Sequence, residues 1–369
     1  MRIGVCLRTW GEKGGIGVYS RNVLRSMLPL GRQHEFVLFY SEPSHLGQFG
    51  DQPNAREVQL KAPDKWTWDQ VAVPFHSWRE KLDVVFHTKF AIPLVSPCPT
   101  AMVLHGSERF VFPEFSHRSD ILFFRTIYPF YLRNASAILS VSENARKDII
   151  RFLHIDPAKV HTIHLAQSAT FHPVTGPERL AAVRKQYALP ERFILNVGLI
   201  YPGKNIPNLL DALKLVRAQE GDVRLVIAGT GKRMYRRDLE MIQQTGLKDA
   251  VLMPGYIPHE DLSAVYSLAR AVVFPSFYES FPAIPLEANA CGCPVVTSRT
   301  GGTPEAAGDA ALYVDPTDVP GIAEATLRIL RDDALRADLI RKGFENVKRF
   351  SWEKTALGTL QVLESLGRT

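Results

Sequence analysis

The sequence has few cysteines and no long apolar run. Its four cysteines are too few for a disulfide framework in a chain of 369 residues, and Cys291 and Cys293 lack the second pair that would complete a zinc site. No segment approaches the ~18 consecutive apolar residues that a membrane-spanning helix needs. The opening residues are interrupted by Arg8 and indicate a strand rather than a signal peptide. We therefore expect a cytoplasmic protein with reduced thiols.

Sequence repeats, low-complexity segments and clusters of basic residues are absent as well. The net charge is +6, and most of it lies in residues 1–170, where 20 Lys and Arg stand against 15 Asp and Glu, while residues 171–369 have 24 against 23. The surplus in the first half permits contact with an anionic partner or a membrane surface. Because no aromatic–basic binding motif accompanies it, we expect no nucleic-acid partner.

The sequence does contain a regular alternation of strand-like and helical segments. The length predicts two domains, and the 46% of hydrophobic residues is typical of globular proteins. Short, mostly apolar runs predict strands at 2–7, 35–40, 56–60, 83–87, 100–105, 137–142 and 160–165, and then at 193–198, 223–229, 250–256, 271–276, 294–298 and 310–314. Helical periodicity lies between them, for example at 178–187, 206–219, 232–245 and 321–349. This alternation predicts an α/β protein with parallel sheets.

The chain divides most naturally within residues 166–192, where a polar stretch with two prolines precedes a helix and a fresh strand. We therefore expect two Rossmann-like domains, residues 1–170 and 171–351, that face each other across a cleft. The pattern leaves open whether the last helix, 352–369, packs back onto the first domain.

The first loop that could bind a ligand follows the first strand and reads W-G-E-K-G-G-I-G-V-Y-S. Gly14, Gly15 and Gly17 lead into a helix expected from about Val18, and glycines there allow a ligand to approach free backbone N–H groups. The third glycine of a dinucleotide fingerprint is absent, because Ser20 occupies that position. A flexible loop that only caps the strand is an equally good interpretation.

The second half opens with N-V-G-L-I-Y-P-G-K-N, in which Gly198 closes a strand and Lys204 precedes a helix. A lysine at a helix N-terminus opposes the helix dipole, at a cost of about 0.5 kcal/mol. Lys204 is therefore a candidate phosphate ligand; the alternative is a solvated surface lysine. A second glycine turn, 229–231, ends the next strand and is weak evidence by itself.

The most informative string is F-P-S-F-Y-E-S-F-P-A-I-P-L-E-A-N-A-C-G-C-P-V-V-T-S. It places Glu279 in a loop after a strand and Glu287 eight residues later, in the first turn of a helix begun near Pro282 or Pro285. Two carboxylates at one sheet edge can accept hydrogen bonds from the hydroxyls of a sugar or a ribose. For Glu287 alone, an acid favoured by the helix dipole is a serious alternative.

This string resembles the E-x7-E motif of the retaining GT-B glycosyltransferases of family four, the large family that includes sucrose synthase and bacterial mannosyltransferases. The resemblance extends through V-G-L-I-Y-P-G-K-N, L-V-I-A-G-T-G, P-G-Y-I-P-H-E-D-L, T-G-G-T-P-E-A-A-G-D and the early G-G-I-G-V-Y. It covers most of residues 190–316 and, more loosely, the first domain. It implies the GT-B fold, with a C-terminal domain that binds a nucleotide-sugar donor and an N-terminal domain that binds the acceptor.

The resemblance also implies roles for individual residues. Lys204 would contact the donor diphosphate, Glu279 the transferred sugar, and Glu287 the nucleotide ribose. His105, which ends V-L-H-G after a strand, matches the histidine near the reacting sugar; a lone histidine there is otherwise structural. The remaining positions implied to contact the donor are Gly15, Gly17, Gly198, Ile257, Ser280, Phe281 and Pro282.

The sequence departs from the family pattern at the phosphate-binding loops. Leu199 stands where many relatives have arginine, and Ser280 and Pro282 replace glycines. No D-x-D carboxylate pair occurs, so we expect a metal-independent enzyme without a cofactor, in which Lys204 stabilises the leaving diphosphate.

We therefore expect a retaining transfer of a mannosyl- or glucosyl-type unit from a nucleoside diphosphate sugar to a glycan or lipid-linked acceptor, in bacterial surface polysaccharide assembly. A non-catalytic nucleotide- or sugar-binding protein is the first alternative, and an NAD(P)-dependent oxidoreductase is a weaker one. Residues 110–131 hold eight aromatic side chains and three nearby arginines. This segment either rests on the inner face of a membrane or contributes aromatic residues to the core.

Overall fold

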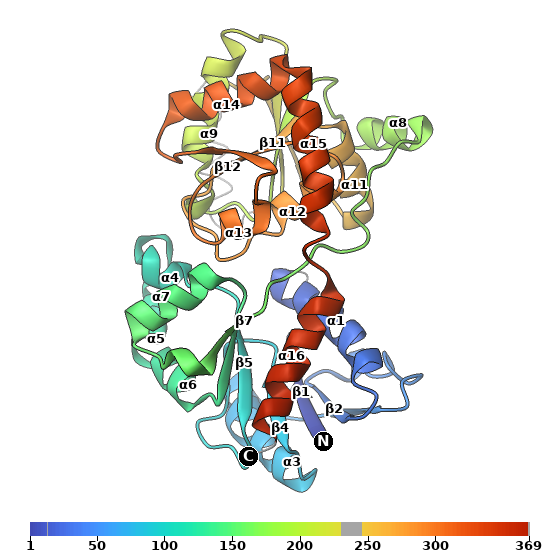
Figure 1. The fold of residues 1–369 in the computed structure, drawn as a ribbon, viewed down its shortest axis with the longest axis vertical. Coiled ribbons are helices and arrows are strands. Elements are labelled where there is room, and N and C mark those ends of the chain that lie inside the picture. Colours follow the sequence, from blue (N-terminus) through green and yellow to red (C-terminus); the bar gives the residue numbers. More distant parts are fainter. Residues whose placement is uncertain (13, 230–245, 368–369) are drawn as a thin grey trace. The chain divides into compact units, whose positions relative to one another are not determined.

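The computed structural model describes residues 1–12, 14–229 and 246–367. The chain forms two compact units, the first comprising Met1–Leu165 together with Ser351–Thr369, and the second Ala166–Phe350. The boundary between the units thus lies five residues before the one expected from the sequence, which follows residue 170. In the first unit, the C-terminal helix α16 (Trp352–Leu366) packs against α1 (Gly15–Leu30), as Figure 1 shows.

The first unit contains a seven-stranded parallel sheet in the order β3-β2-β1-β4-β5-β6-β7. All seven strands expected from the sequence are present: β1 (Arg2–Cys6), β2 (Glu35–Tyr40), β3 (Ala55–Gln59), β4 (Val84–His87), β5 (Thr100–Leu104), β6 (Ala137–Ser140) and β7 (Val160–Thr162). The other helices of this unit are α2 (Lys65–Thr67), α3 (Val73–Arg79), α4 (Glu108–Val111), α5 (Arg118–Thr126), α6 (Tyr128–Asn134) and α7 (Glu143–Leu153). Because β1 pairs with both β2 and β4, the strand order reverses there, and the loops after β1 and β4 meet at the carboxyl edge.

The second unit contains a six-stranded parallel sheet in the order β10-β9-β8-β11-β12-β13. The six strands expected in this half are present: β8 (Phe193–Val197), β9 (Arg224–Ala228), β10 (Val251–Gly255), β11 (Ala271–Phe274), β12 (Val295–Ser298) and β13 (Ala311–Val314). Its α-helices among the described residues are α8 (Pro177–Gln186), α9 (Ile206–Arg217), α11 (His259–Leu268), α12 (Ile284–Ala290), α13 (Thr303–Ala307), α14 (Val319–Arg331) and α15 (Asp333–Val347). Here the order reverses between β8 and β11, which brings the loops after these two strands together.

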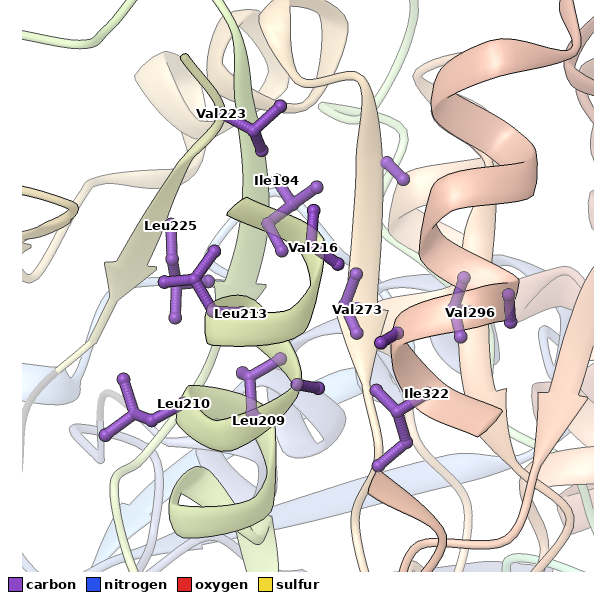
Figure 2. Packing of buried hydrophobic residues seen from close by; sticks show 14 of the residues in the cluster. Ile194, Leu209, Leu210, Leu213, Val216, Val223, Leu225, Val273, Val296 and Ile322 are labelled. Atoms are coloured by element: carbon purple, nitrogen blue, oxygen red, sulfur yellow. The ribbon is translucent and has the colours of Figure 1, made fainter. Parts of the chain in front are cut away.

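The sheet of the second unit is covered on both faces, as its near-continuous apolar strands predict. Figure 2 shows Leu209, Leu213 and Val216 of α9 packed over Ile194 and Val273 of the sheet. Each of these side chains is almost fully buried, which stabilises the fold by about 1.5–3 kcal/mol per side chain. A second apolar cluster on this unit includes residues of α11 and α12 and holds the elements that carry the candidate site.

Three of the helical segments expected from the sequence have other bounds in the structure or lie outside the described residues. Helix α1 begins at Gly15, three residues before Val18, with Gly14 as its N-cap. The segment 321–349 forms two helices, because Asp332 ends α14 and its side chain accepts a hydrogen bond from the N–H of Leu335, which starts α15. The helix expected at 232–245, and residues 230 and 231 of the glycine turn, lie outside the described residues.

The aromatic segment 110–131 belongs largely to the core. Phe124, Tyr128 and Tyr131 are buried in one apolar cluster. The ring of Phe110 stacks on Tyr128 with centroids 5.9 Å apart and lies edge-to-face with Phe124 at 5.8 Å. Its large apolar side chains with substantial exposure are Leu122, Ile127 and Phe130. The core interpretation therefore accounts for most of these aromatics, and membrane contact by this segment stays a prediction. Among the described residues, no helix is long and apolar enough to cross a membrane.

Candidate active site

Two of the predicted site residues meet at the point where the second sheet reverses its strand order. Lys204 lies in the loop after β8 and Glu279 in the loop after β11, and the Nζ of Lys204 donates a 2.7 Å hydrogen bond to Oε1 of Glu279. The side chains are only 10% and 15% exposed. The structure thus brings together a cation and a carboxylate that are 75 residues apart in the sequence.

Lys204 is held by its surroundings as well as by this ion pair. It ends a short 3-10 turn, Pro202–Lys204, and its Nζ lies 4.5 Å from the ring centroid of Phe274. The next residue, Asn205, has a φ of 59° and donates hydrogen bonds from Nδ2 to the carbonyl oxygens of Pro275 and Pro316. The residue is 8% exposed, so the interpretation of Lys204 as a solvated surface lysine is wrong.

Glycines allow the loops around this pair to approach each other. Gly198 has a φ of 124°, and a Cβ on Gly229 would lie 1.8 Å from the carbonyl oxygen of Gly198. A Cβ on Gly301 would lie 2.2 Å from the carbonyl oxygen of Glu279, and the N–H of Gly302 donates to that same oxygen at 2.7 Å. The loop after β12 therefore fixes the backbone of Glu279, a contact that was not foreseen from the sequence.

Glu287 lies in the first turn of α12 and has a different partner. The hydroxyl of Tyr266, on α11, donates a 2.8 Å hydrogen bond to Oε2 of Glu287. Burial raises the pKa of Glu287 to about 7, although the Tyr266 hydrogen bond and the charge of Lys204 both lower it. Tyr266 is fully buried and was not identified from the sequence, because an aromatic residue in a helical pattern normally indicates only core packing.

The other donor-contact residues predicted in this unit are also well buried. Ser280 and Phe281 are 7% and 8% exposed, and the Phe281 ring packs on Phe350 with centroids 5.6 Å apart. Pro282 is buried beside them, and α12 begins two residues later, at Ile284. Ile257 is 3% exposed and belongs to the apolar cluster that also contains Tyr266. Their contacts with a ligand stay predictions.

His105 lies in the first unit, in the loop after β5. Its Nε2 lies 2.8 Å from the carbonyl oxygen of Thr88, and the ring contacts the edge of Tyr19 with centroids 4.9 Å apart. Because a carbonyl oxygen only accepts, Nε2 carries the proton, and Nδ1 is left as an acceptor. Burial lowers the pKa of His105 to about 4, so the imidazole is neutral at pH 7.

In the glycine loop of the first unit, one glycine allows two stretches of backbone to pack closely together. Gly15 is the first residue of α1, and a Cβ there would meet no atom of the described residues within 4 Å. A Cβ on Gly17 would lie 1.9 Å from the carbonyl oxygen of Glu12. The turn itself therefore requires a glycine at position 17, whether or not a ligand binds there.

A buried ionic cluster next to this loop was also missed. Arg8 and Asp69 form an ion pair with Nη2 and Oδ2 2.9 Å apart, and burial raises the pKa of Asp69 to about 6. His87 is fully enclosed beside them, and burial lowers its pKa to about 3. A cavity of about 520 Å³ borders this cluster at Arg8 and is also lined by Glu12 and Trp68. No sequence motif indicates the cluster, because its members come from three distant segments.

Comparison with known proteins matches both halves of the chain to glycosyltransferase families. Residues 181–346 match the model for glycosyl transferases group 1, and residues 13–166 match that for glycosyltransferase family 4. The O-antigen chain mannosyltransferase B of Escherichia coli is 33% identical over 264 residues, which cover 71% of this chain and 69% of that protein. The chain spans less than a third of the longer E. coli mannosyltransferases that it also matches.

Solved structures with the same fold cover nearly the whole chain. Sucrose-phosphate synthase from Thermosynechococcus elongatus has a TM-score of 0.77 at 23% identity and covers 99% of each chain. Anabaena Alr3699/HepE in complex with UDP and glucose has a TM-score of 0.78 at 17% identity, over 99% of this chain and 100% of that one. The two parallel-sheet units therefore have the GT-B fold.

Proposed function

Because the chain belongs to the group 1 (family 4) glycosyltransferases, we propose that it transfers a mannosyl- or glucosyl-type unit from a nucleoside diphosphate sugar to a hydroxyl of a glycan or lipid-linked acceptor. We further propose that the anomeric configuration is retained, that no metal is needed, and that the product belongs to a bacterial surface polysaccharide. The observation that carries this proposal is the buried Lys204–Glu279 pair at the switch point of the second sheet. It offers a cation for a diphosphate and a carboxylate for sugar hydroxyls in one place.

The comparisons support the substrate classes. The E. coli relative is a mannosyltransferase of the O-antigen chain, and the HepE structure contains UDP and glucose. Glu287 adds an acceptor for the ribose hydroxyls, because its second carboxylate oxygen is not used by Tyr266.

The chemistry follows from these groups. When the donor binds, Lys204 moves its hydrogen bond from Glu279 to the diphosphate, and Glu279 accepts hydrogen bonds from the sugar. The bond between the anomeric carbon and the diphosphate oxygen breaks, its electron pair passes to that oxygen, and Lys204 stabilises the developing charge. The acceptor oxygen bonds to the anomeric carbon on the same face, and its proton passes to the leaving phosphate oxygen. This transfer retains the configuration and requires no covalent enzyme intermediate.

His105 contributes a neutral acceptor in this proposal. The Thr88 carbonyl fixes its tautomer, and the low pKa keeps the ring uncharged, so Nδ1 accepts a hydrogen bond from a hydroxyl of the reacting sugar.

The direct test is turnover with purified protein. GDP-mannose and UDP-glucose are each supplied with a polysaccharide-derived acceptor and excess chelator, release of nucleoside diphosphate is measured, and the anomeric proton of the product is assigned by NMR. We expect turnover with one donor, an unchanged anomeric configuration and no effect of the chelator. Donor binding without turnover or hydrolysis would instead favour a non-catalytic binding protein, and inversion or chelator sensitivity would contradict the mechanism.

A further inference from the structure

The imidazole of His105 is held by one hydrogen bond and one ring contact. Its Nε2 donates to the carbonyl oxygen of Thr88 at 2.8 Å. The ring also packs against that of Tyr19, with centroids 4.9 Å apart and planes at 81°, an edge-to-face arrangement. Because the Cβ–Cγ torsion of histidine has broad minima, one hydrogen bond at Nε2 still allows the ring to swing. The direction of Nδ1 therefore depends on the contact with Tyr19.

Tyr19 is placed by the glycine loop of the first unit. It lies on α1, two residues after Gly17, where a Cβ would lie 1.9 Å from the carbonyl oxygen of Glu12. That close approach fixes the start of the helix and with it the position of Tyr19, which is buried. Burial also raises the pKa of the Tyr19 phenol, so the hydroxyl stays protonated and needs an acceptor.

The acceptor is on the C-terminal helix α16, which packs against α1 (Figure 1). The Tyr19 hydroxyl forms a hydrogen bond with the side chain of Thr359. Because Oγ1 of Thr359 donates its own proton to the carbonyl oxygen of Thr355 at 2.7 Å, it accepts from Tyr19. The Tyr19 ring also contacts that of Trp352, with centroids 6.0 Å apart. Trp352, Thr355 and Thr359 follow one another at intervals of three and four residues, so they lie on one side of the helix.

Helix α16 is fixed in turn to the rest of the first unit. Oγ1 of Thr355 donates to the carbonyl oxygen of His164, after β7, at 2.7 Å. The side chain of Ser351 caps the start of the helix. Contacts thus run without interruption from α16 through Tyr19 to His105. A phenylalanine would fill the same space without needing an acceptor, so core packing alone does not account for a tyrosine here.

We propose that Tyr19 is a positioning residue: it fixes the plane of the His105 imidazole, and α16 holds Tyr19 in place. The fixed plane keeps Nδ1 directed at a hydroxyl of the reacting sugar, a consequence that rests on the proposed function. The charged groups near the imidazole are Lys89 and Glu12, which pair with each other at 2.9 Å. Because the imidazole is neutral, an ion pair with either of them does not orient it.

The competing explanation is that Tyr19 only fills the core, and a double-mutant cycle separates the two. Tyr19→Leu should lower kcat by about tenfold or more, while the KM for the donor changes by less than about twofold. In the His105→Gln background, Tyr19→Leu should cause no further loss, because the ring that it orients is gone. A purely structural loss would instead multiply with that of His105→Gln, and such multiplication would overturn the proposal.

Two milder variants keep the ring of Tyr19 and release its hydroxyl, so the test stays decisive if Tyr19→Leu folds poorly. Tyr19→Phe and Thr359→Val should each lower kcat by about two- to fivefold, again with no loss in the His105→Gln background. Met27→Ala is the control, because Met27 is fully buried on α1, about 12 Å farther along the helix. It should lower stability and leave kcat within about twofold of the wild type. A loss of kcat equal to that of Tyr19→Leu would overturn the proposal.

Nuclear magnetic resonance of protein with ¹⁵N-labelled histidine tests the proposal without turnover. The ring signals of His105 are identified by their absence in His105→Gln. The wild type should show one tautomer, with the proton on Nε2, and no protonation above about pH 5, because the pKa is about 4. In Tyr19→Leu we expect exchange-averaged signals and titration at a higher pH, since water enters the space left by the ring.

Unchanged tautomer signals and an unchanged titration of His105 in folded Tyr19→Leu would overturn the proposal. Because this measurement needs no substrate, it remains decisive if the protein shows no glycosyl transfer. The positioning role of Tyr19 and the proposed function can therefore fail separately.

Discussion

The Nζ of Lys204 and the Oε1 of Glu279, 2.7 Å apart, neutralise each other at the carboxyl edge of the second sheet. The pair holds a lysine with 8% exposure in a fixed position before any ligand arrives. A diphosphate can replace the carboxylate as the partner of Lys204, so the lysine stays paired when the donor binds. The sugar hydroxyls can likewise replace Lys204 as the partners of Glu279. The pair is thus a site with its charges already desolvated and oriented.

The first prediction concerns Lys204. Replacing Lys204 with alanine should lower kcat by about 10²–10³-fold, since it removes the countercharge of the leaving diphosphate. It should also lower the unfolding free energy by about 2 kcal/mol, because Glu279 is left partly buried without its partner. Steady-state kinetics and thermal unfolding measure the two effects. Lys214→Ala is the matched control, because Lys214 forms an exposed ion pair with Asp211 on α9. Near-normal turnover in Lys204→Ala would contradict the assignment.

Apolar patterning predicted the two sheets, because all thirteen strands were recognised from their composition. Lys204 and Glu279 were assigned to one donor only by the family resemblance, and their ion pair was not foreseen. Tyr266 and Gly301 were missed because their roles depend on contacts with residues 21 and 22 positions away, which no local pattern encodes.

The second prediction concerns the hydrogen bond from Tyr266. Tyr266→Phe removes a group that lowers the pKa of Glu287, so that pKa should rise above about 7. If the ionised carboxylate binds the ribose hydroxyls, affinity for a nucleotide sugar should increase with pH through this pKa, and the inflection should move upward in the variant. Calorimetric titration between about pH 5.5 and 8.5 measures it, with a nucleotide sugar because its diphosphate does not titrate there. Tyr187→Phe is the control, because that hydroxyl binds Asp261; identical inflections in Tyr266→Phe and wild type would refute the coupling.

The third prediction concerns the loop that fixes Glu279. Gly301→Ala combines a positive φ of 57° with a Cβ that would lie 2.2 Å from the carbonyl oxygen of Glu279, so the loop must shift and take Glu279 with it. Donor affinity and turnover should fall at least tenfold, in addition to a loss of about 1–2 kcal/mol of stability from the strained backbone. Gly246→Ala separates the two effects, because Gly246 has a φ of 71° and, within the described part of the chain, no neighbour within 4 Å of a Cβ. Equal loss of turnover in both variants would mean that strain alone is responsible.

The last prediction concerns pH and His105. Its pKa of about 4 in the folded protein lies below the ordinary value of 6.5, so the unfolded chain binds more protons between these two values. His105 therefore contributes stability that is fully present above about pH 6.5 and is lost as the pH falls towards 4. His105→Gln should make the unfolding free energy less sensitive to pH in that window, as chemical denaturation at several pH values can show.

For the same reason, the turnover of the wild type should show no inflection from His105 near pH 6.5. An imidazolium required for turnover would instead produce a rate that falls as the pH rises through 6.5, and such a limb, absent in His105→Gln, would overturn the assignment of His105 as a neutral acceptor.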